Sequence, residues 1–178
     1  MNSATALGSS RCREKLNVMR VGIGHDSHRL VPGRPLILGG VRIDYSHGLL
    51  GHSDADVVLH ALTDALLGAA GLGDIGDTYP DTDPAFRDAT SAVFVTQTCE
   101  RLNRTGWRLV NVDITIFAEE PKLGPVKSEM RRNLAGLLQV DAGAINVKAK
   151  TGEGVGTIGR REAIACQAIV LIEHRGAT

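Results

Sequence analysis

An aspartate and a histidine stand two residues apart near the start of the chain, in Asp26-Ser27-His28. Residues at this spacing on a β-strand point to the same face, so both side chains could grip one ion. A third candidate, His60, lies on a stretch with a helical period, one turn from both Asp56 and Asp64. That spacing lets a carboxylate orient the imidazole. Two histidines and one aspartate with an open fourth position form the ligand pattern of a catalytic zinc; ordinary polar surface residues are the alternative.

Two further segments could hold anionic groups. His52-Ser53-Asp54 precedes the helical stretch, where free N–H groups attract phosphate, although Ser53 could serve only as the helix cap. The segment 154–159 formally matches the G-x-G-x-x-G dinucleotide fingerprint. A dinucleotide-binding fold requires a helix after this motif, whereas the sequence that follows is strand-like, so we reject that interpretation. We therefore expect a loop whose backbone approaches a ligand or another subunit, or else a flexible hairpin loop. Its charged and polar neighbours could form a phosphate clamp and supply a hard-metal ligand: Lys150, Thr151, Glu153 and Arg160.

Strands and helices must bring these residues together. Apolar alternation predicts strands at 18–23, at 36–43 with a break at Gly39-Gly40, and at 107–117, 145–150 and 163–172. Helical periods predict helices from Ser53 to about 70, at 91–103, and from 125 to about 139. The segment 74–84 is too rich in turn formers for regular structure. Because strands and helices mix without a strict βαβ order, we expect an α+β fold, a mixed sheet with helices packed on one face.

Composition excludes several classes of function. The length of 178 residues suits one domain, which we place at 19–178. We expect residues 1–18 to be a disordered N-terminal extension. Alternatively, they are a transit-peptide remnant, or the natural chain starts at Met19. Zero net charge and 3% aromatic residues argue against nucleic-acid binding and leave ligands to polar groups and backbone. Three cysteines without a C-x-x-C pair fit a reducing compartment, and no apolar run is long enough to span a membrane. We expect a cytoplasmic protein, or a plastid one if residues 1–18 are a transit remnant.

Six ordered blocks carry a resemblance to one family: 24–28, 48–68, 73–84, 121–123, 146–149 and 159–165. Over residues 19–172 the chain resembles the 2-C-methyl-D-erythritol 2,4-cyclodiphosphate synthases of the non-mevalonate isoprenoid pathway. The resemblance implies a homotrimer with active sites between neighbouring subunits. It also implies a zinc ion and a second divalent cation, Mg²⁺ or Mn²⁺.

The resemblance assigns roles by position. Asp26, His28 and His60 would be the zinc ligands, in agreement with the open site argued above, and Glu153 would hold the second cation. His52 and Thr151 match positions that help to stabilise the transition state. The erythritol part of the substrate would contact Ser53, Asp74, Ile75, Gly76, Tyr79, Pro80, Asp81, Thr82 and Asp83. The cytidine diphosphate pocket, on the neighbouring subunit, would comprise Ala118, Pro121, Lys122, Leu123 and Gly124. Further substrate contacts would come from Asp26, His28, His52, Lys150, Thr151, Gly152, Glu153, Thr157 and Arg160.

The reaction that the resemblance implies is an intramolecular cyclisation. The 2-phosphate of 4-diphosphocytidyl-2-C-methyl-D-erythritol 2-phosphate attacks the β-phosphorus, and CMP leaves. Because attacker and target belong to one molecule, positioning and charge neutralisation suffice, and no protein nucleophile is required. A zinc-dependent phosphohydrolase that activates water at the same three residues is one alternative, and a metal-binding module without catalysis is another.

Overall fold

The first strand extends well beyond the segment that apolar alternation indicates. The computed structural model describes residues 18–80, 86 and 89–175, and in it β1 spans Met19–Pro32. It pairs antiparallel with β7 (Ala163–His174), from Met19 opposite Glu173 to Arg29 opposite Ala163. Hydrogen bonds to β7 thus hold residues 24–29 extended although their sequence is polar. The expectation that Asp26 and His28 share a strand face is confirmed.

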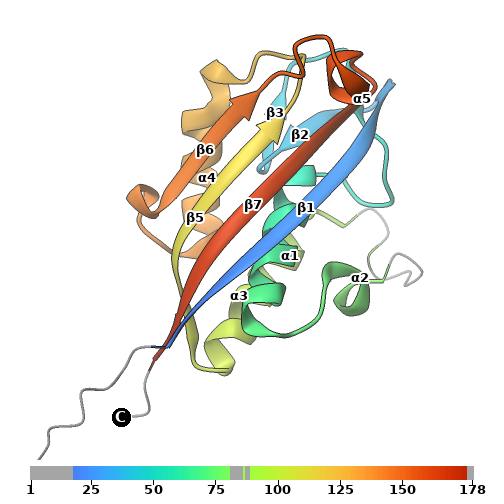
Figure 1. Cartoon of the computed structure of the whole chain (residues 1–178). Helices are drawn as coiled ribbons and strands as arrows, with labels where there is room; N and C mark the ends of the chain where they lie inside the picture. The colour runs from blue at the N-terminus through green and yellow to red at the C-terminus, as the bar shows by residue number, and fades with distance from the viewer. Residues whose placement is uncertain (1–17, 81–85, 87–88, 176–178) are drawn as a thin grey trace, which may run out of the picture.

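A five-stranded mixed sheet forms one layer of the molecule (Figure 1). Its strand order is β4 (His47–Leu49), β1, β7, β5 (Trp107–Phe117) and β6 (Ile145–Lys150). Only β5 and β6 run parallel; the other neighbours are antiparallel. The predicted break at Gly39-Gly40 is confirmed as a turn between β2 (Leu36–Leu38) and β3 (Val41–Ile43), which form a separate hairpin. Both glycines have positive φ, which glycine adopts without strain.

Helices cover one face of the sheet, as the sequence predicted for an α+β fold (Figure 1). The long ones are α1 (Val57–Ala70), α3 (Ala92–Arg104) and α4 (Lys127–Leu138). Short helical turns are α2 (Ile75–Thr78), α5 (Gly156–Gly159), η2 (Gly124–Val126) and η3 (Ala142–Ala144). The core lies between the sheet and the long helices, with fully buried side chains that include Leu62, Leu66, Ile114, Ile116 and Ile164.

The start of α1 corrects the sequence prediction. The helix begins at Val57, and its N-cap is Asp56 rather than Ser53. One oxygen of the Asp56 carboxylate accepts from the N–H groups of Val58 and Leu59 at 3.0 and 3.2 Å. The same buried carboxylate accepts from Gly39 and Gly40 at 2.9 and 2.6 Å. Asp56 thus takes the N–H groups of Val58 and Leu59, which are not available to an anion.

Two segments predicted to be irregular contain single helical turns. The polar segment after residue 73 includes α2, whose N-cap Asp74 accepts from the N–H of Asp77 at 2.8 Å. The glycine-rich segment includes α5. In α2, the cap from Asp74 stabilises a helical turn although the amino-acid composition of the segment favours irregular structure.

Glycines on β1 set the distance between β1 and α1. A Cβ atom at Gly22 would lie 2.0 Å from the carbonyl oxygen of Ala65, and one at Gly24 would lie 2.0 Å from that of Ala61. Strand and helix backbones are therefore in direct contact. This contact fixes the separation of any residues that reach from β1 to α1.

Two observations concern membrane and redox chemistry. Across the described parts of the chain, each helix is too short or too polar to cross a bilayer. Cys99 and Cys166, the cysteines in those parts, are free thiols.

Candidate active site

Three potential metal ligands converge between β1 and α1. Asp26 and His28 project from the helix-facing side of β1, and His60 projects from α1 toward them. Asp26 Oδ2 lies 3.0 Å from His28 Nε2 and 2.9 Å from His60 Nδ1, and the two nitrogens are 3.2 Å apart. A tetrahedral zinc with bonds of about 2.0–2.1 Å spaces its ligand atoms only slightly further apart, about 3.3–3.4 Å. The donor set therefore fits a three-ligand zinc site.

Electrostatics keep the Asp26 side chain ionised. Burial by itself raises the pKa of this carboxyl, but hydrogen bonds and charges from His28 and His60 outweigh it and hold the pKa well below its usual range. Burial lowers the pKa of His28, yet the hydrogen bond and charge of Asp26 raise it overall. An anionic ligand is thus available at neutral pH, and the cluster as a whole favours a cation.

The residues that orient His60 differ from those predicted. Asp56 is engaged as the helix cap, and Asp64 accepts from the N–H of Ile75 at 2.8 Å, so the prediction that either one orients the imidazole is wrong. Instead, His60 Nε2 lies 2.8 Å from Ser91 Oγ and 3.3 Å from Ser53 Oγ. These serines were not predictable partners because one follows a loop 31 residues further along the chain.

A cavity of about 400 Å³ opens beside the metal cluster. Its size is typical of a small-molecule site. Eight of the residues that the resemblance assigns to metal or substrate line it: His28, His52, Ser53, His60, Ile75, Gly76, Tyr79 and Pro80. Asp74 belongs to the same segment but is exposed at the N-cap of α2 and does not line the cavity. Asp81, Thr82 and Asp83 lie outside the described residues.

Aromatic side chains form an apolar wall of this cavity, which the low aromatic content did not suggest. Tyr79 and Phe94 stack with ring centroids 4.8 Å apart, and Phe86 packs edge-on against both. The Tyr79 hydroxyl donates to the carbonyl of Phe94 at 3.2 Å. Three of the six aromatic residues thus gather at one site. Only a tertiary contact could show this, because these residues come from separate segments.

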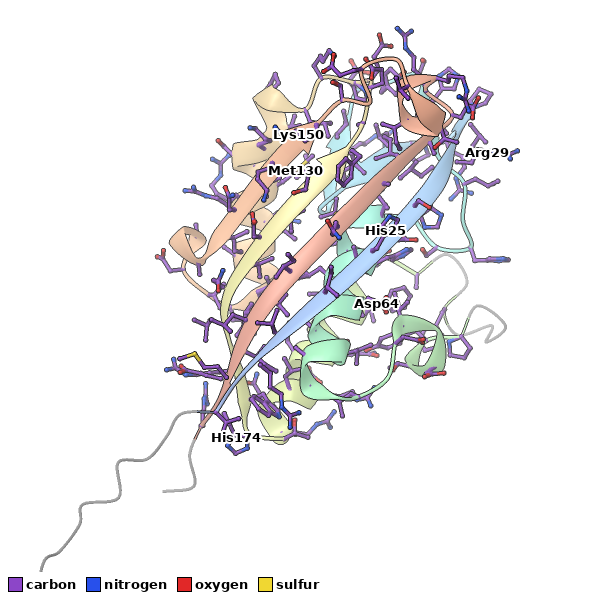
Figure 2. All side chains as sticks on the ribbon, viewed as in Figure 1. His25, Arg29, Asp64, Met130, Lys150 and His174 are labelled. Atoms are coloured by element: carbon purple, nitrogen blue, oxygen red, sulfur yellow. The ribbon has the colours of Figure 1, made fainter. Side chains whose placement is uncertain are left out.

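The other assigned residues lie away from the cavity, toward the ends of β5 and β6. In Figure 2, Lys150 lies at the β6 edge of the sheet, and β5 and β7 separate it from His25 of β1. The Ala118 N–H donates to the Lys150 carbonyl at 2.9 Å, and the Gly152 N–H donates to Glu119 Oε2 at 2.9 Å. The segments 118–124 and 150–153 therefore form one unit, which we call the distal group. It contains Ala118, Pro121, Lys122, Leu123, Gly124, Lys150, Thr151, Gly152 and Glu153.

Charged side chains of the distal group and its surroundings are accessible. Thr151 Oγ1 donates to Glu153 Oε1 at 2.6 Å, on an exposed turn. Arg160 donates to both carboxylate oxygens of Glu162, at 2.8 and 3.2 Å. Thr157 lines a different cavity, of about 530 Å³, which also includes His28. No residue of the distal group lines the cavity of about 400 Å³ beside the metal cluster.

Comparison with known proteins gives a consistent result. The model of the YgbB family matches residues 19–173. A 2-C-methyl-D-erythritol 2,4-cyclodiphosphate synthase of Bordetella pertussis is 58% identical over 157 residues, which cover 88% of this chain and 97% of that protein. A CDP-bound structure of a synthase of the same name matches with a TM-score of 0.80 and 40% identity, over 86% of this chain and 99% of the other. The bifunctional IspDF of Campylobacter jejuni matches with a TM-score of 0.86 and 45% identity, over 89% of this chain and 43% of that one.

Proposed function

Because this chain belongs to the YgbB family, we infer that the cavity beside Asp26, His28 and His60 is where its cyclisation reaction takes place. The chain converts 4-diphosphocytidyl-2-C-methyl-D-erythritol 2-phosphate to 2-C-methyl-D-erythritol 2,4-cyclodiphosphate and releases CMP. It is a lyase of non-mevalonate isoprenoid biosynthesis. The observation that carries the placement is the zinc-like donor set at the wall of a cavity that eight assigned residues line. The relatives give no support to a phosphohydrolase.

Two cation sites follow from the donor groups. Asp26, His28 and His60 would hold zinc, and Glu153 would hold Mg²⁺ or Mn²⁺ together with the substrate's phosphates, as single carboxylates commonly do. When bound, the zinc would polarise the β-phosphate and the second cation would offset charge that grows on departing CMP.

The chain's own residues position the substrate and exclude water. The 2-phosphate forms the new bond to the β-phosphorus while the bond from that phosphorus to the CMP oxygen breaks, so the protein need supply no nucleophile. His52 and Ser53 lie at the cavity wall, where they can hold the phosphates in line. The aromatic wall of Tyr79, Phe86 and Phe94 keeps water from the β-phosphorus, which favours cyclisation over hydrolysis.

A homotrimer would bring the two halves of the site together. No distal-group residue lines the cavity beside the metal cluster, so we infer that a neighbouring copy supplies the nucleotide pocket. The helix-free face of the sheet exposes apolar side chains: Val21 is 67% exposed, Ile23 61% and Ile169 42%. An exposed apolar sheet face is a candidate for subunit contact. These observations support active sites between subunits.

Phosphorus NMR provides the direct test. Purified protein is incubated with the cytidyl substrate and Mg²⁺, with and without a zinc chelator. We expect CMP and cyclic diphosphate in equal amounts, with both lost on chelation. An open-chain bisphosphate or inorganic phosphate in place of the cyclic product would indicate a hydrolase. Absence of turnover in folded, zinc-loaded protein would favour a binding module.

A further inference from the structure

Ser91 stands directly before α3 but does not cap it. The residue is fully buried at the N-cap position, and its hydroxyl makes no hydrogen bond to the N–H groups of its own helix. Serine at this position normally makes that bond. Here the hydroxyl instead lies 2.8 Å from His60 Nε2 and donates to Asp54 Oδ1. A helix-capping interaction is given up for a contact with a metal-ligand histidine.

The direction of these hydrogen bonds follows from counting protons. An ionised Asp54 can only accept, and its other oxygen accepts from the Ser91 backbone N–H at 3.1 Å. A serine hydroxyl has one proton, which Ser91 gives to Asp54. The Ser91 oxygen must therefore accept from His60, so Nε2 carries a proton.

The consequence reaches the opposite side of the imidazole ring. With a proton held on Nε2, Nδ1 is the nitrogen whose lone pair is left for a metal ion, and it faces Asp26 Oδ2 and His28 Nε2 at 2.9 and 3.2 Å. A histidine binds metal through such a lone pair. We propose that Ser91 and Asp54 are positioning residues that fix the tautomer and ring orientation of His60 for zinc. This proposal rests on the proposed zinc site.

Other neighbours of Nε2 do not replace this arrangement. Ser53 Oγ lies 3.3 Å from Nε2, further than the 2.8 Å of Ser91 Oγ, so Ser91 is the closer partner. Asp54 and Ser91 come from the segments that precede α1 and α3, so their contact also ties these two helix starts to the cluster. The hydrogen bonds from His60 to Ser91 and from Ser91 to Asp54 thus link α1 with the segments before α1 and α3.

Asp54→Asn is the sharpest variant because it preserves shape and reverses one hydrogen bond. The new side-chain amide has one oxygen and one NH₂ group, and one of them must face the Ser91 N–H. If the NH₂ group faces the Ser91 N–H, two donors meet, which is unfavourable. Otherwise the NH₂ group faces the Ser91 side-chain oxygen. In the second case the Ser91 hydroxyl turns and donates to His60 Nε2, which moves the imidazole proton to Nδ1 and blocks metal binding there. Ser91→Ala removes the acceptor altogether. Thr96→Ala, an exposed hydroxyl deletion on the same helix, is the matched control.

Zinc affinity is measured by competition with a chromophoric chelator, with thermal unfolding as the test of folding. We expect the zinc dissociation constant to rise about 10- to 100-fold in Asp54→Asn and Ser91→Ala and to stay unchanged in Thr96→Ala. Long-range ¹H–¹⁵N correlation on metal-free protein, at a pH where the imidazole is neutral, should show the His60 proton on Nε2 in the unaltered chain and on Nδ1 in Asp54→Asn.

Two results would overturn the proposal: unaltered zinc affinity in both variants, or an Nε2 proton that persists in Asp54→Asn. Failure of the proposed function looks different, because the unaltered chain would then bind no zinc. Even in that case the tautomer measurement decides whether Ser91 and Asp54 control the imidazole.

Discussion

Each histidine and carboxylate at the cluster has a distinct physical task. Asp26 supplies the negative charge, and its pKa stays low because two imidazoles lie within hydrogen-bond distance. His60 supplies Nδ1 as a ligand atom, and the contact of Nε2 with Ser91 on the opposite side of the ring orients it. Removal of either one should therefore affect the metal more than the fold, since both lie at the margin of the core.

His60→Ala tests the ligand set. The variant should lose bound zinc and reduce turnover by at least roughly 10²–10³-fold, because the remaining two ligands hold the metal weakly and the β-phosphate loses its polarising group. Zinc is quantified by atomic absorption after gel filtration, and turnover by CMP release. His47→Ala, on β4, serves as control. Full activity in a zinc-free variant would contradict the assignment.

Phe94→Ala tests the exclusion of water. The substitution removes the ring on which Tyr79 stacks and opens the cavity toward solvent. Water could then attack the β-phosphorus, so we expect an open-chain bisphosphate beside the cyclic product, and CMP in excess of cyclic diphosphate. The buried ring also contributes stability, about 3–5 kcal/mol by analogy with other such truncations. Phosphorus NMR and thermal unfolding measure the two effects, and a purely cyclic product would refute the role of this wall.

At the scale of elements, the backbone contact between β1 and α1 is the feature on which the cluster depends. Two ligands stand on β1 and one on α1, and Gly22 and Gly24 let the two backbones meet. The separation of the ligand atoms is therefore a property of strand–helix packing rather than of the ligands themselves.

Gly24→Ala should separate these elements. Its Cβ would lie 2.0 Å from the Ala61 carbonyl and 2.7 Å from the Ala65 nitrogen, both backbone atoms that cannot rotate away. We expect a loss of about 1–3 kcal/mol or more in the free energy of unfolding, together with weaker zinc binding. Gly68→Ala is the control: it lies within α1 with open space around it, and should stabilise the helix by about 1 kcal/mol. Unchanged zinc affinity in Gly24→Ala would show that the cluster tolerates a shift of α1.

The parallel pair β5–β6 has a pH-dependent contact. Lys148 donates to Asp113 Oδ2 at 2.5 Å, and this hydrogen bond lowers the pKa of Asp113. A lowered folded-state pKa means that the stabilisation is fully present above the unfolded-state pKa, about 3.9, and is lost as the pH falls from there through the lower folded-state pKa. The pair is partly exposed, so it contributes no more than about 1 kcal/mol.

Urea unfolding of Lys148→Met across pH 2.5–7 checks this prediction. The variant should be less stable than the unaltered chain at pH 6 and should approach it near pH 2.5. Lys127→Met, which removes a charge from α4, controls for net charge. A stability difference that persists at pH 2.5 would mean that Lys148 acts through packing.

At the scale of the whole molecule, the two faces of the sheet differ. Helices cover one face and bury the core, while the other face carries the exposed apolar residues Val21, Ile23 and Ile169 (Figure 1). In the proposed homotrimer, this exposed face would lie between the subunits. The domain bounds at 19–178, the extension at 1–18 and the cytoplasmic location stay predictions.

Ile23→Asp tests the assembly. A charge in the middle of the exposed sheet face should convert a trimer to monomers, because burial of an unpaired carboxylate is costly. The monomer should remain folded and bind zinc but lose turnover, since its sites lack the neighbour's nucleotide pocket. Light scattering after gel filtration gives the mass, with Val93→Asp on α3 as control. A fully active Ile23→Asp monomer would place the complete site within one chain.

The sequence by itself determined what depends on near neighbours. Apolar periods placed α1, α3, α4 and the strands β5 and β6, because a side chain's face follows from its position in a regular element. The two-residue spacing of Asp26 and His28 held for the same reason. The blocks of resemblance identified the family, and the family model that matches residues 19–173 confirms it.

Only the tertiary structure decided which distant groups meet. Hydrogen bonds to β7 extended β1 through a polar segment, and the buried Asp56 took the helix cap that Ser53 was expected to form. Tyr79, Phe86 and Phe94 met at one wall. Ser91 left its own helix to contact His60. In each case a group could pair with several partners that lie far apart in the chain. Packing decides which of these groups are buried together, and local sequence spacing does not encode that.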